Sequence, residues 1–247
     1  MNVNEIGAFR GTTLIHKEGT IGGARSVFVK LKGIKNDLVY PTFGGDIKNP
    51  FKGAAKFYAG DLMEFRTNNK GVKPEVYILK TYLVESVSGS VVNIVNDGYK
   101  HKPFVGDKLG VAPDEIGGEM TAYTVVAVAN ATVNGKKVWA VTFDVPVTTE
   151  EEGETTEEED VLAKAGDVLV EADADDNMMV KAINAVADSD GDMIYAPAQG
   201  DEDFDGARYH YVPALGGTMY IHKMSPLPAC VLALNESKIN GWFKISL

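Results

Sequence analysis

Residues 76–95 consist of two runs rich in apolar residues on either side of a polar bend, which is a pattern typical of a β-hairpin. The runs Val76–Val84 and Val91–Val95 are rich in β-branched and aromatic residues, which favour strands. They flank Ser86–Ser90, whose Ser-Gly-Ser sequence suits a bend. We therefore expect the two runs to pair as antiparallel strands.

A second hairpin is predicted over residues 123–145. Tyr123–Ala129 runs into Asn134-Gly135, and Lys137–Val145 then returns with apolar residues at every second position. Asn-Gly is a strong signal for a two-residue hairpin turn, because both positions can adopt a positive φ.

A short pattern of Gly-Asp followed by apolar residues occurs three times, at Ala59–Phe65, Val105–Val111 and Ala165–Glu171. Glycine accommodates the positive φ of a turn, and the aspartate can accept a hydrogen bond from a backbone N–H group there. Each copy is therefore expected to be a turn that leads into a strand. Chance or generic turn chemistry explains so short a pattern at least as well as the alternative, which is a repeated β-barrel-like module.

Further strands are expected near the C-terminus, at Arg208–Val212, Thr218–Lys223, Ala229–Leu234 and Trp242–Ile245. The stretch Asn177–Ala187 fits two interpretations. Its residues Met179, Ile183 and Val186 would share one face of a helix, whereas its two ends resemble strand ends.

Residues 1–58 are interpreted as an extended arm. Glycine doublets and prolines interrupt them, and only Ser26–Lys32 alternates as a strand does. Few neighbours are available to bury the aromatic side chains of such an arm, so it would gain most stability by lying against another surface. The aromatic side chains expected to be exposed are Phe9, Phe43, Phe51 and Phe57.

The fold class expected from these patterns is mainly β, with small β-barrel or sandwich modules and an extended N-terminal arm. The expected divisions are the arm (1–58), a β-barrel-like domain (59–147), an acidic segment (148–160) and a second β-rich domain (161–247). The acidic segment holds eight acidic residues and no basic or apolar one, so it cannot form part of a core. It is either a linker between two β modules, which we favour, or a long loop within one.

Charge is distributed unevenly around the net value of −11. Residues 1–80 carry 13 basic and 7 acidic side chains, whereas residues 150–247 carry 6 and 21. The N-terminal third therefore either faces an acidic partner or forms an ordinary solvated surface. The chain contains neither a signal-peptide pattern nor the run of about 20 apolar residues that a membrane span needs, so we expect cytoplasmic synthesis and no membrane partner.

No residue pattern assembles a recognisable catalytic or metal site, so we expect a protein that is not an enzyme and needs no cofactor. Asp188–Asp192 resembles the start of a calcium loop, but its glycine comes too early, and a solvated acidic turn is the preferred interpretation.

The single cysteine, Cys230, excludes an internal disulfide and lies in an apolar run where a buried thiol is usual. His210 and His222 lie on neighbouring expected strands, where ordinary core or surface histidines are also common. The basic residues are too sparse for specific nucleic-acid binding.

The Gly-rich arm, the three Gly-Asp turns and the Asn134-Gly135 hairpin together resemble auxiliary head proteins of tailed bacteriophages, the decoration and head-fibre components, especially those of crAss-like phages. The resemblance extends over most of the chain. It implies a virion protein on the outer surface of the capsid that binds the major capsid protein, stabilises the head or projects from it, and forms a homo-oligomer. Residues 1–58 would face the capsid, through Phe9, Arg10, Arg25, Lys30, Lys32, Phe43, Phe51 and Lys52.

Two other functions stay open at this point. The first is a carbohydrate-binding or adhesin module whose sugar platform is formed by exposed aromatic residues, namely Trp139, Trp242, Tyr209 and Tyr211. The second and weaker alternative is a hydrolase that uses acidic residues between positions 188 and 205.

Overall fold

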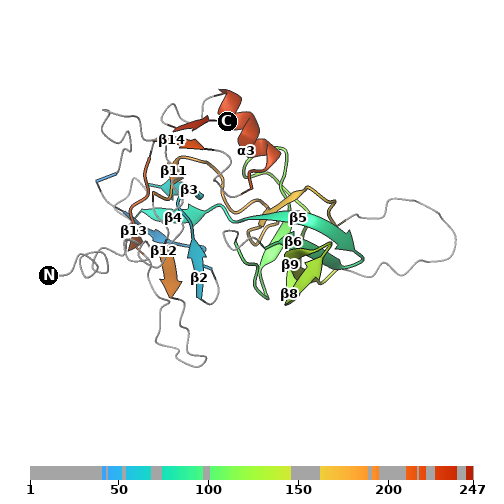
Figure 1. Ribbon diagram of the computed structural model, residues 1–247. Helices are drawn as coiled ribbons and strands as arrows, with labels where there is room; N and C mark the ends of the chain where they lie inside the picture. The colour runs from blue at the N-terminus through green and yellow to red at the C-terminus, as the bar shows by residue number, and fades with distance from the viewer. Residues whose placement is uncertain are drawn as a thin grey trace. The chain divides into compact units, whose positions relative to one another are not determined.

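The computed structural model describes residues 41–42, 44–51, 54–67, 74–96, 101–145, 162–188, 191–194, 210–215, 217–220, 226–237 and 243–246. Within these residues the chain is mainly β, as the alternating patterns predict. It divides into two compact units (Figure 1). Unit 1 draws on residues 1–80 and 180–247, and unit 2 is formed by residues 81–179. Unit 2 is thus inserted into the chain of unit 1.

These two units differ from the divisions expected from the sequence. The described residues on both sides of the acidic segment, up to Val145 and from Leu162, belong to unit 2. The segment 148–160 itself lies outside the described residues. The linker interpretation fails because the strand that follows the segment completes the same barrel as the strands before it.

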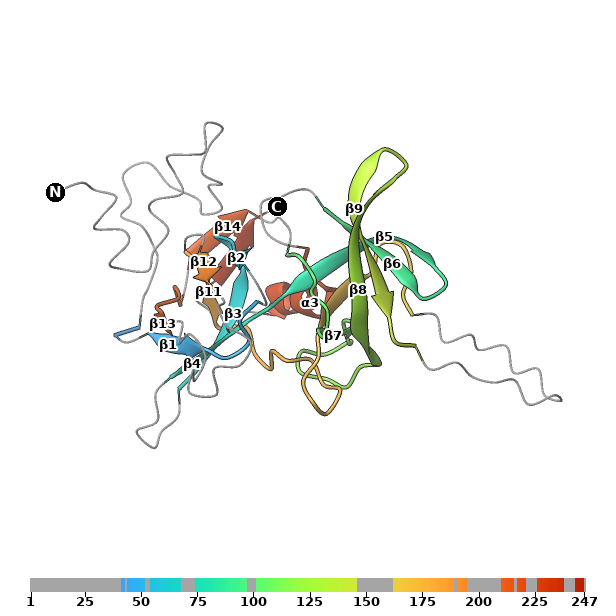
Figure 2. The same cartoon turned by 90° about the horizontal axis from the view of Figure 1, so that it is seen from below.

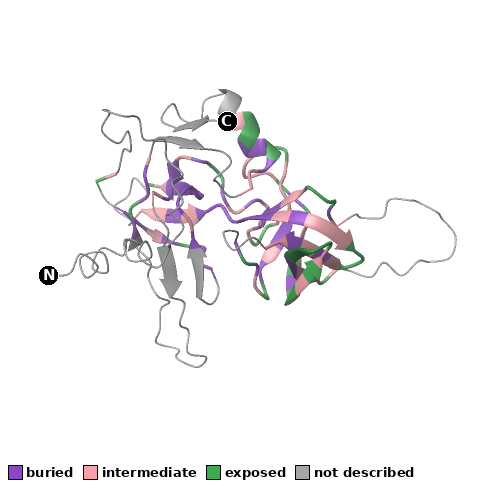
Figure 3. Ribbon diagram, viewed as in Figure 1, coloured by how far each residue is buried: buried purple, intermediate pink, exposed green. Residues whose placement is uncertain are grey.

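Unit 2 is built around a closed barrel of six strands in the order β10-β5-β6-β9-β8-β7, with antiparallel pairing throughout. The strands are β5 (Thr81–Ser88), β6 (Val91–Val95), β7 (Lys108–Val111), β8 (Ala122–Val133), β9 (Lys136–Phe143) and β10 (Val168–Glu171). Alternate residues of these strands fill the interior, which includes Tyr82, Ile94, Leu109, Trp139 and Leu169. Figure 3 colours the ribbon by burial and shows buried residues on the barrel strands, whereas exposed residues lie along β8 and at the start of β9.

Both predicted hairpins are present. β8 and β9 meet at Asn134 and Gly135, which have φ values of 51° and 78°, as a two-residue turn with positive φ requires. β5 and β6 meet at Gly89, with φ of 57°. The first expected strand, however, is two strands: β4 (Glu75–Ile78) ends before Leu79 and belongs to unit 1, and β5 begins at Thr81 in unit 2.

The three Gly-Asp sequences form the same turn, which confirms the prediction made from their pattern. In each, the aspartate Oδ2 accepts the N–H of the residue three positions earlier, and the aspartate N–H donates to the C=O of that residue. The pairs are Tyr58 and Asp61 (2.7 and 2.9 Å), Phe104 and Asp107 (2.8 and 3.0 Å), and Lys164 and Asp167 (2.7 and 3.1 Å). The glycines have φ values of 91°, 82° and 94°, at Gly60, Gly106 and Gly166.

Each Gly-Asp turn also fixes a neighbouring strand. The glycine N–H and the aspartate C=O exchange hydrogen bonds of 2.7–2.9 Å with one residue across the sheet, which is Ala187, Val125 and Val84 in the three copies. Each turn therefore sets both the start of its own strand and the register of the next.

Unit 1 contains a five-stranded sheet in the order β11-β3-β4-β1-β13, in which only β1 and β4 run parallel. Its strands besides β4 are β1 (Gly45–Ile47), β3 (Leu62–Arg66), β11 (Ala185–Val186) and β13 (His210–Tyr211). Two further pairs belong to this unit: β2 (Ala54–Phe57) with β12 (Gly191–Ile194), antiparallel, and β14 (Gly217–Tyr220) with β15 (Phe243–Ser246), parallel. The ambiguous stretch 177–187 contains no helix: it forms isolated bridges at Asn177 and Met178 and includes β11 near its end.

The strand expected at Ala229–Leu234 is instead the helix α3 (Ala229–Ser237). Alanine and leucine are strong helix formers, and a proline is well suited to the start of a helix. The C=O of Pro228 accepts the N–H groups of Val231 (3.0 Å) and Leu232 (3.1 Å) and so forms the first turn. Cys230 is buried, as expected, but on a helix.

Candidate functional site

The residues that the resemblance assigns to capsid contact lie, with one exception, outside the described residues. These are Phe9, Arg10, Arg25, Lys30, Lys32, Phe43 and Lys52. The exception is Phe51, which is 1% exposed. The Nζ atom of Lys80 lies 4.9 Å from the centre of its ring and donates to the C=O of Pro50 (3.2 Å). Phe51 is thus a core residue of unit 1, and the expectation that it is exposed is wrong.

Phe57 is the second aromatic residue expected to be exposed that is buried. It is 3% exposed, and its ring packs edge to face on Tyr211 with 4.8 Å between ring centres. Both Phe51 and Phe57 are buried because the chain around them takes part in unit 1, where β1 and β2 each pair with strands from elsewhere in the sequence. The expected arm therefore does not include residues 45–57.

The aromatic platform of the carbohydrate-binding alternative is not formed by the residues that are described. Trp139 is 7% exposed and lies in the barrel core of unit 2, and Tyr211 is 5% exposed in unit 1. Trp242 and Tyr209 lie outside the described residues. A sugar platform needs exposed rings, so Trp139 and Tyr211 cannot serve in this role.

The acidic region after residue 187 is only partly described. The Tyr211 hydroxyl donates to Asp188 Oδ1 (2.8 Å) and accepts the Asp188 N–H (3.1 Å). Gly191 and Asp192 lie in strand β12, not in a turn. His210 lies opposite Asp46 in the β1–β13 pair, and His222 is outside the described residues. In the described ranges, no group of three or more His, Cys, Asp or Glu side chains is placed to hold a metal ion.

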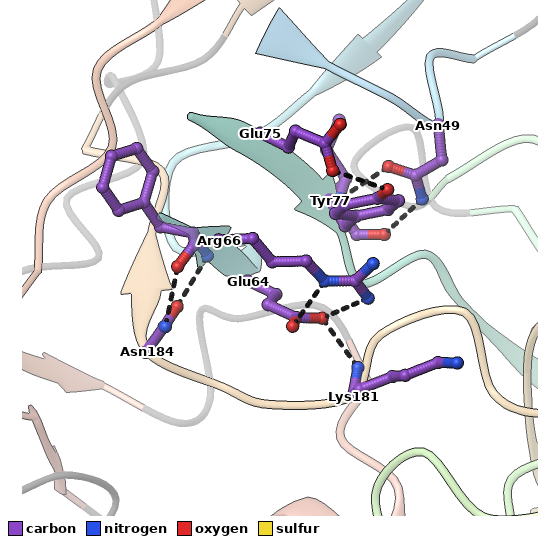
Figure 4. A network of polar contacts seen from close by, with 9 residues as sticks. Asn49, Glu64, Arg66, Glu75, Tyr77, Lys181 and Asn184 are labelled. Carbon is purple, nitrogen blue, oxygen red and sulfur yellow. Dashed lines mark hydrogen bonds and ion pairs between the residues drawn. The ribbon is translucent and has the colours of Figure 1, made fainter. Parts of the chain in front are cut away.

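A network of polar side chains lies on one face of β3 and β4 (Figure 4). The register places Glu64 opposite Tyr77 and Arg66 opposite Glu75. Arg66 donates to both carboxylate oxygens of Glu64, from Nε (2.6 Å) and Nη2 (2.8 Å), and its guanidinium lies 3.8 Å from the centre of the Tyr77 ring. We call Glu64, Arg66, Glu75 and Tyr77 the β3–β4 polar cluster.

The β3–β4 polar cluster ties a distant segment to the sheet. Glu64 is 6% exposed, and its Oε2 also accepts the backbone N–H of Lys181 (2.7 Å). Three residues further on, the Asn184 side chain accepts the N–H of Phe65 (2.6 Å) and donates to its C=O (2.9 Å). The chain that returns from unit 2 is therefore held to β3 by side chains just before β11 begins.

The pKa values of Arg66 and Tyr77 are both raised within the cluster. Hydrogen bonds from Arg66 to Glu64 raise the pKa of the guanidinium above its usual value. Burial, followed by the negative charge of Glu75, raises the pKa of the Tyr77 phenol, whose hydroxyl donates to Glu75 Oε2 (3.1 Å). A bidentate Arg–carboxylate pair that also satisfies a backbone N–H is an arrangement that holds structure together.

Sequence reasoning missed this cluster. A signal was present, because Glu64 and Arg66, like Glu75 and Tyr77, stand two residues apart and so share a face of a strand. The register that brings the two pairs together depends on the pairing of β3 with β4, which the sequence did not indicate.

Described residues of unit 2 line pockets at two places. One, of about 440 Å³, is lined by Glu119, Met120, Thr121, Asp175 and Asp176. Its acidic character is reduced by Lys108, whose Nζ lies 2.8 Å from Asp176 Oδ1. The other, of about 580 Å³, is lined by Asn96, Asn130, Ala131, Thr132, Lys137 and Val138.

Among the described residues, no helix has the length and apolar character that crossing a membrane requires. Comparison of the chain with models of protein families, with curated proteins and with solved structures gave no match.

Proposed function

We propose that the chain is a viral structural protein that binds the outer surface of a capsid as an auxiliary, decoration or head-fibre component. The observation that carries the proposal is the formation of the three Gly-Asp turns and the Asn134-Gly135 hairpin, which are features on which the resemblance to phage head proteins rests. These turns make two small β units that are held by backbone ladders. Such a role needs a stable surface and no covalent step.

The proposed contact with the capsid rests on the basic excess of the N-terminal third. Residues 1–80 carry six more basic than acidic side chains, whereas the chain as a whole has a net charge of −11. A basic region on an acidic protein favours one orientation on an acidic surface, because the rest of the chain is repelled from that surface. Phe51 is not part of the proposed contact, since it is buried in unit 1.

The first test is electron microscopy and mass spectrometry of tailed-phage particles produced with and without this chain. The proposal predicts that the chain is a component of purified particles and that its loss removes density from the outer capsid surface. Particles that lack the chain, or a surface unchanged by its deletion, would contradict the proposal.

A second test measures co-sedimentation of the purified full-length chain with particles from which it was deleted. The triple variant Arg25→Glu, Lys30→Glu, Lys32→Glu is expected to lose most of its binding. The matched control is Lys102→Glu, Lys137→Glu, Lys164→Glu, which changes the net charge equally at exposed positions of unit 2. Equal loss in both variants would show that binding depends on overall charge and not on the N-terminal region.

A further inference from the structure

Strand β8 extends well beyond the barrel that it helps to form. Its first residues pair with β7, through Lys108 opposite Thr124, Leu109 opposite Tyr123 and Gly110 opposite Ala122. From Ala127 to Val133 it pairs with β9 and with no other strand of the described residues. Figure 2 shows the β8–β9 hairpin projecting past the neighbouring strands of unit 2. We call residues 126–133 the outer edge of β8.

A β-bulge marks the start of this outer edge. The register between β8 and β9 shifts between Val125 and Ala127, and Val126 is 48% exposed. A bulge bends its strand and increases the local twist, so it separates β8 from β7 at this point. Alternate residues beyond the bulge then direct their N–H and C=O groups away from β9.

The chemistry of the outer edge is unusual for an exposed strand. Its residues are Val, Ala, Val, Ala, Asn, Ala, Thr and Val, with no charged residue, proline or glycine. Most of them are exposed. Natural proteins protect an open strand edge with charges, above all lysine, or with proline, because an unprotected one pairs with other strands. The only lysines of this hairpin, Lys136 and Lys137, stand on β9 beyond the turn.

We propose that the outer edge of β8 pairs antiparallel with the same edge of a second copy of this chain, about a two-fold axis at Ala129. This pairing places Ala129 opposite Ala129 of the second copy and Val128 opposite its Asn130, so that opposed side chains share a face of the sheet. It joins the two hairpins into one continuous sheet with the order β9-β8-β8-β9. Such an interface is isologous, because each copy offers the same residues to the other.

Charge identifies a second copy as the occupant. Two chains with a net charge of −11 repel each other over most of their surface, and the outer edge lets them meet where neither carries a charge. Lys136, at the tip of the hairpin, already pairs with Glu85 of the same chain (2.6 Å), so its charge does not lie at the outer edge. The contact between the two copies would therefore be made by uncharged residues.

The test is sedimentation velocity of the full-length chain at concentrations from roughly 1 to 100 μM, which cover micromolar dissociation constants. The wild-type chain is expected to form a dimer. Ala129→Lys and Ala129→Asp each place two like charges beside the axis, so each alone is expected to weaken dimerisation at least tenfold. An equal mixture of the two is expected to dimerise again, because lysine then meets aspartate. Ala129→Thr, which keeps an uncharged β-forming residue, is the matched control and is expected to dimerise as the wild type does.

Far-UV circular dichroism and thermal unfolding show whether each variant keeps its fold, and a variant that unfolds is replaced by the same pair of charges at Asn130, which is also exposed and stands next to the axis. A wild-type chain that stays monomeric over this range overturns the proposal. So does an assembly that survives both charged substitutions, or a mixture of the two variants that fails to associate. The proposal does not depend on capsid binding, because the measurement uses the isolated chain, and its failure leaves the proposed function untouched.

Discussion

The side chain of Asn49 continues a β-ladder with the backbone of Ile78. Its Oδ1 accepts the Ile78 N–H (2.7 Å), and its Nδ2 donates to the Ile78 C=O (2.8 Å). The preceding link of the ladder, from the Lys48 N–H to the Val76 C=O (2.9 Å), is an ordinary backbone bond. Asn49 therefore replaces a strand residue at the point where β1 has ended.

We predict that Asn49→Ala lowers the free energy of unfolding by about 2 kcal/mol, because it leaves two polar groups of the fully buried Ile78 without partners. Asn49→Asp is expected to cost more at neutral pH, since a carboxylate then faces a carbonyl oxygen. Chemical denaturation measures both, and hydrogen exchange at the Ile78 amide locates the effect. Asn96→Ala, at a partly exposed asparagine, is the control, with an expected change below about 0.5 kcal/mol. Equal losses for Asn49→Ala and Asn96→Ala would refute this role.

Arg66→Lys is predicted to destabilise unit 1 by about 1 kcal/mol. An ammonium group cannot make two parallel bonds to Glu64 or stack flat on Tyr77. The side chain of Arg66 is 32% exposed, so solvent screening keeps the loss small. Tyr77→Phe keeps the ring and removes only the bond to Glu75, so it should cost less in the same denaturant titration. The reverse order would mean that the ring contact and the bidentate pair are unimportant.

Tyr82→Phe is predicted to leave stability unchanged or to raise it by up to about 1 kcal/mol at neutral pH. The Tyr82 hydroxyl is fully buried in the barrel of unit 2 and has no hydrogen-bond partner among the described residues, so its removal ends a desolvation cost. Tyr211→Phe is the contrasting variant, because that hydroxyl makes two bonds to Asp188. Its loss is expected to cost about 1–2 kcal/mol. A clear loss of stability in Tyr82→Phe would reveal a partner for the hydroxyl.

The same tyrosine predicts a specific weakness in alkali. Burial, and then the charges of Asp107 and Glu171, raises the pKa of the Tyr82 phenol well above its ordinary value of 10.0. Above about pH 10 the unfolded chain loses this proton while the folded chain keeps it, so stability falls as pH rises. Below that pH both states are protonated and the contribution is constant. The loss of stability between about pH 9 and pH 11 should be smaller in Tyr82→Phe than in the wild type. Identical pH profiles of stability for the two proteins would contradict the assignment.

Alanine substitutions at Gly166 and Gly110 distinguish the cost of backbone strain from the cost of a steric clash. Gly166 has φ of 94° and open space around its missing Cβ, so Gly166→Ala should cost only the backbone term, about 1–2 kcal/mol. At Gly110 in β7 a Cβ would lie 2.1 Å from the C=O oxygen of Thr121. Gly110→Ala is therefore expected to be clearly the more damaging in thermal unfolding, and the opposite ranking would be inconsistent with the structure.

Local chemistry made part of this fold predictable from the sequence. The bonds that define a Gly-Asp turn join residues three positions apart, as between Phe104 and Asp107, and the Asn134-Gly135 turn needs only its own two φ angles. All of that information lies within a few residues. The mainly β class followed from the same local signals.

The features that were not predicted depend on partners far along the chain. The strand-forming run from Val76 to Val84 is not interrupted where the chain passes from unit 1 to unit 2, and all residues from Ile78 to Tyr82 are buried, so nothing local marks the boundary. The bond between Asn184 and Phe65 spans 119 positions, and nothing near either residue announces it. The helix α3 was missed because a short apolar run fits a helix and a strand equally well.

The insertion of unit 2 within unit 1 sets an order of events during synthesis. When the ribosome has released residue 179, all six barrel strands of unit 2 exist, but β11 and β13, which border β3 and β1, have not yet been made. At roughly 5–20 residues per second, the last of them follows within several seconds. Strands β1 and β3 are thus synthesised early but lack a neighbouring strand until β13 and β11 have been made. Any pause in translation after residue 179 prolongs the period in which their open edges can pair wrongly.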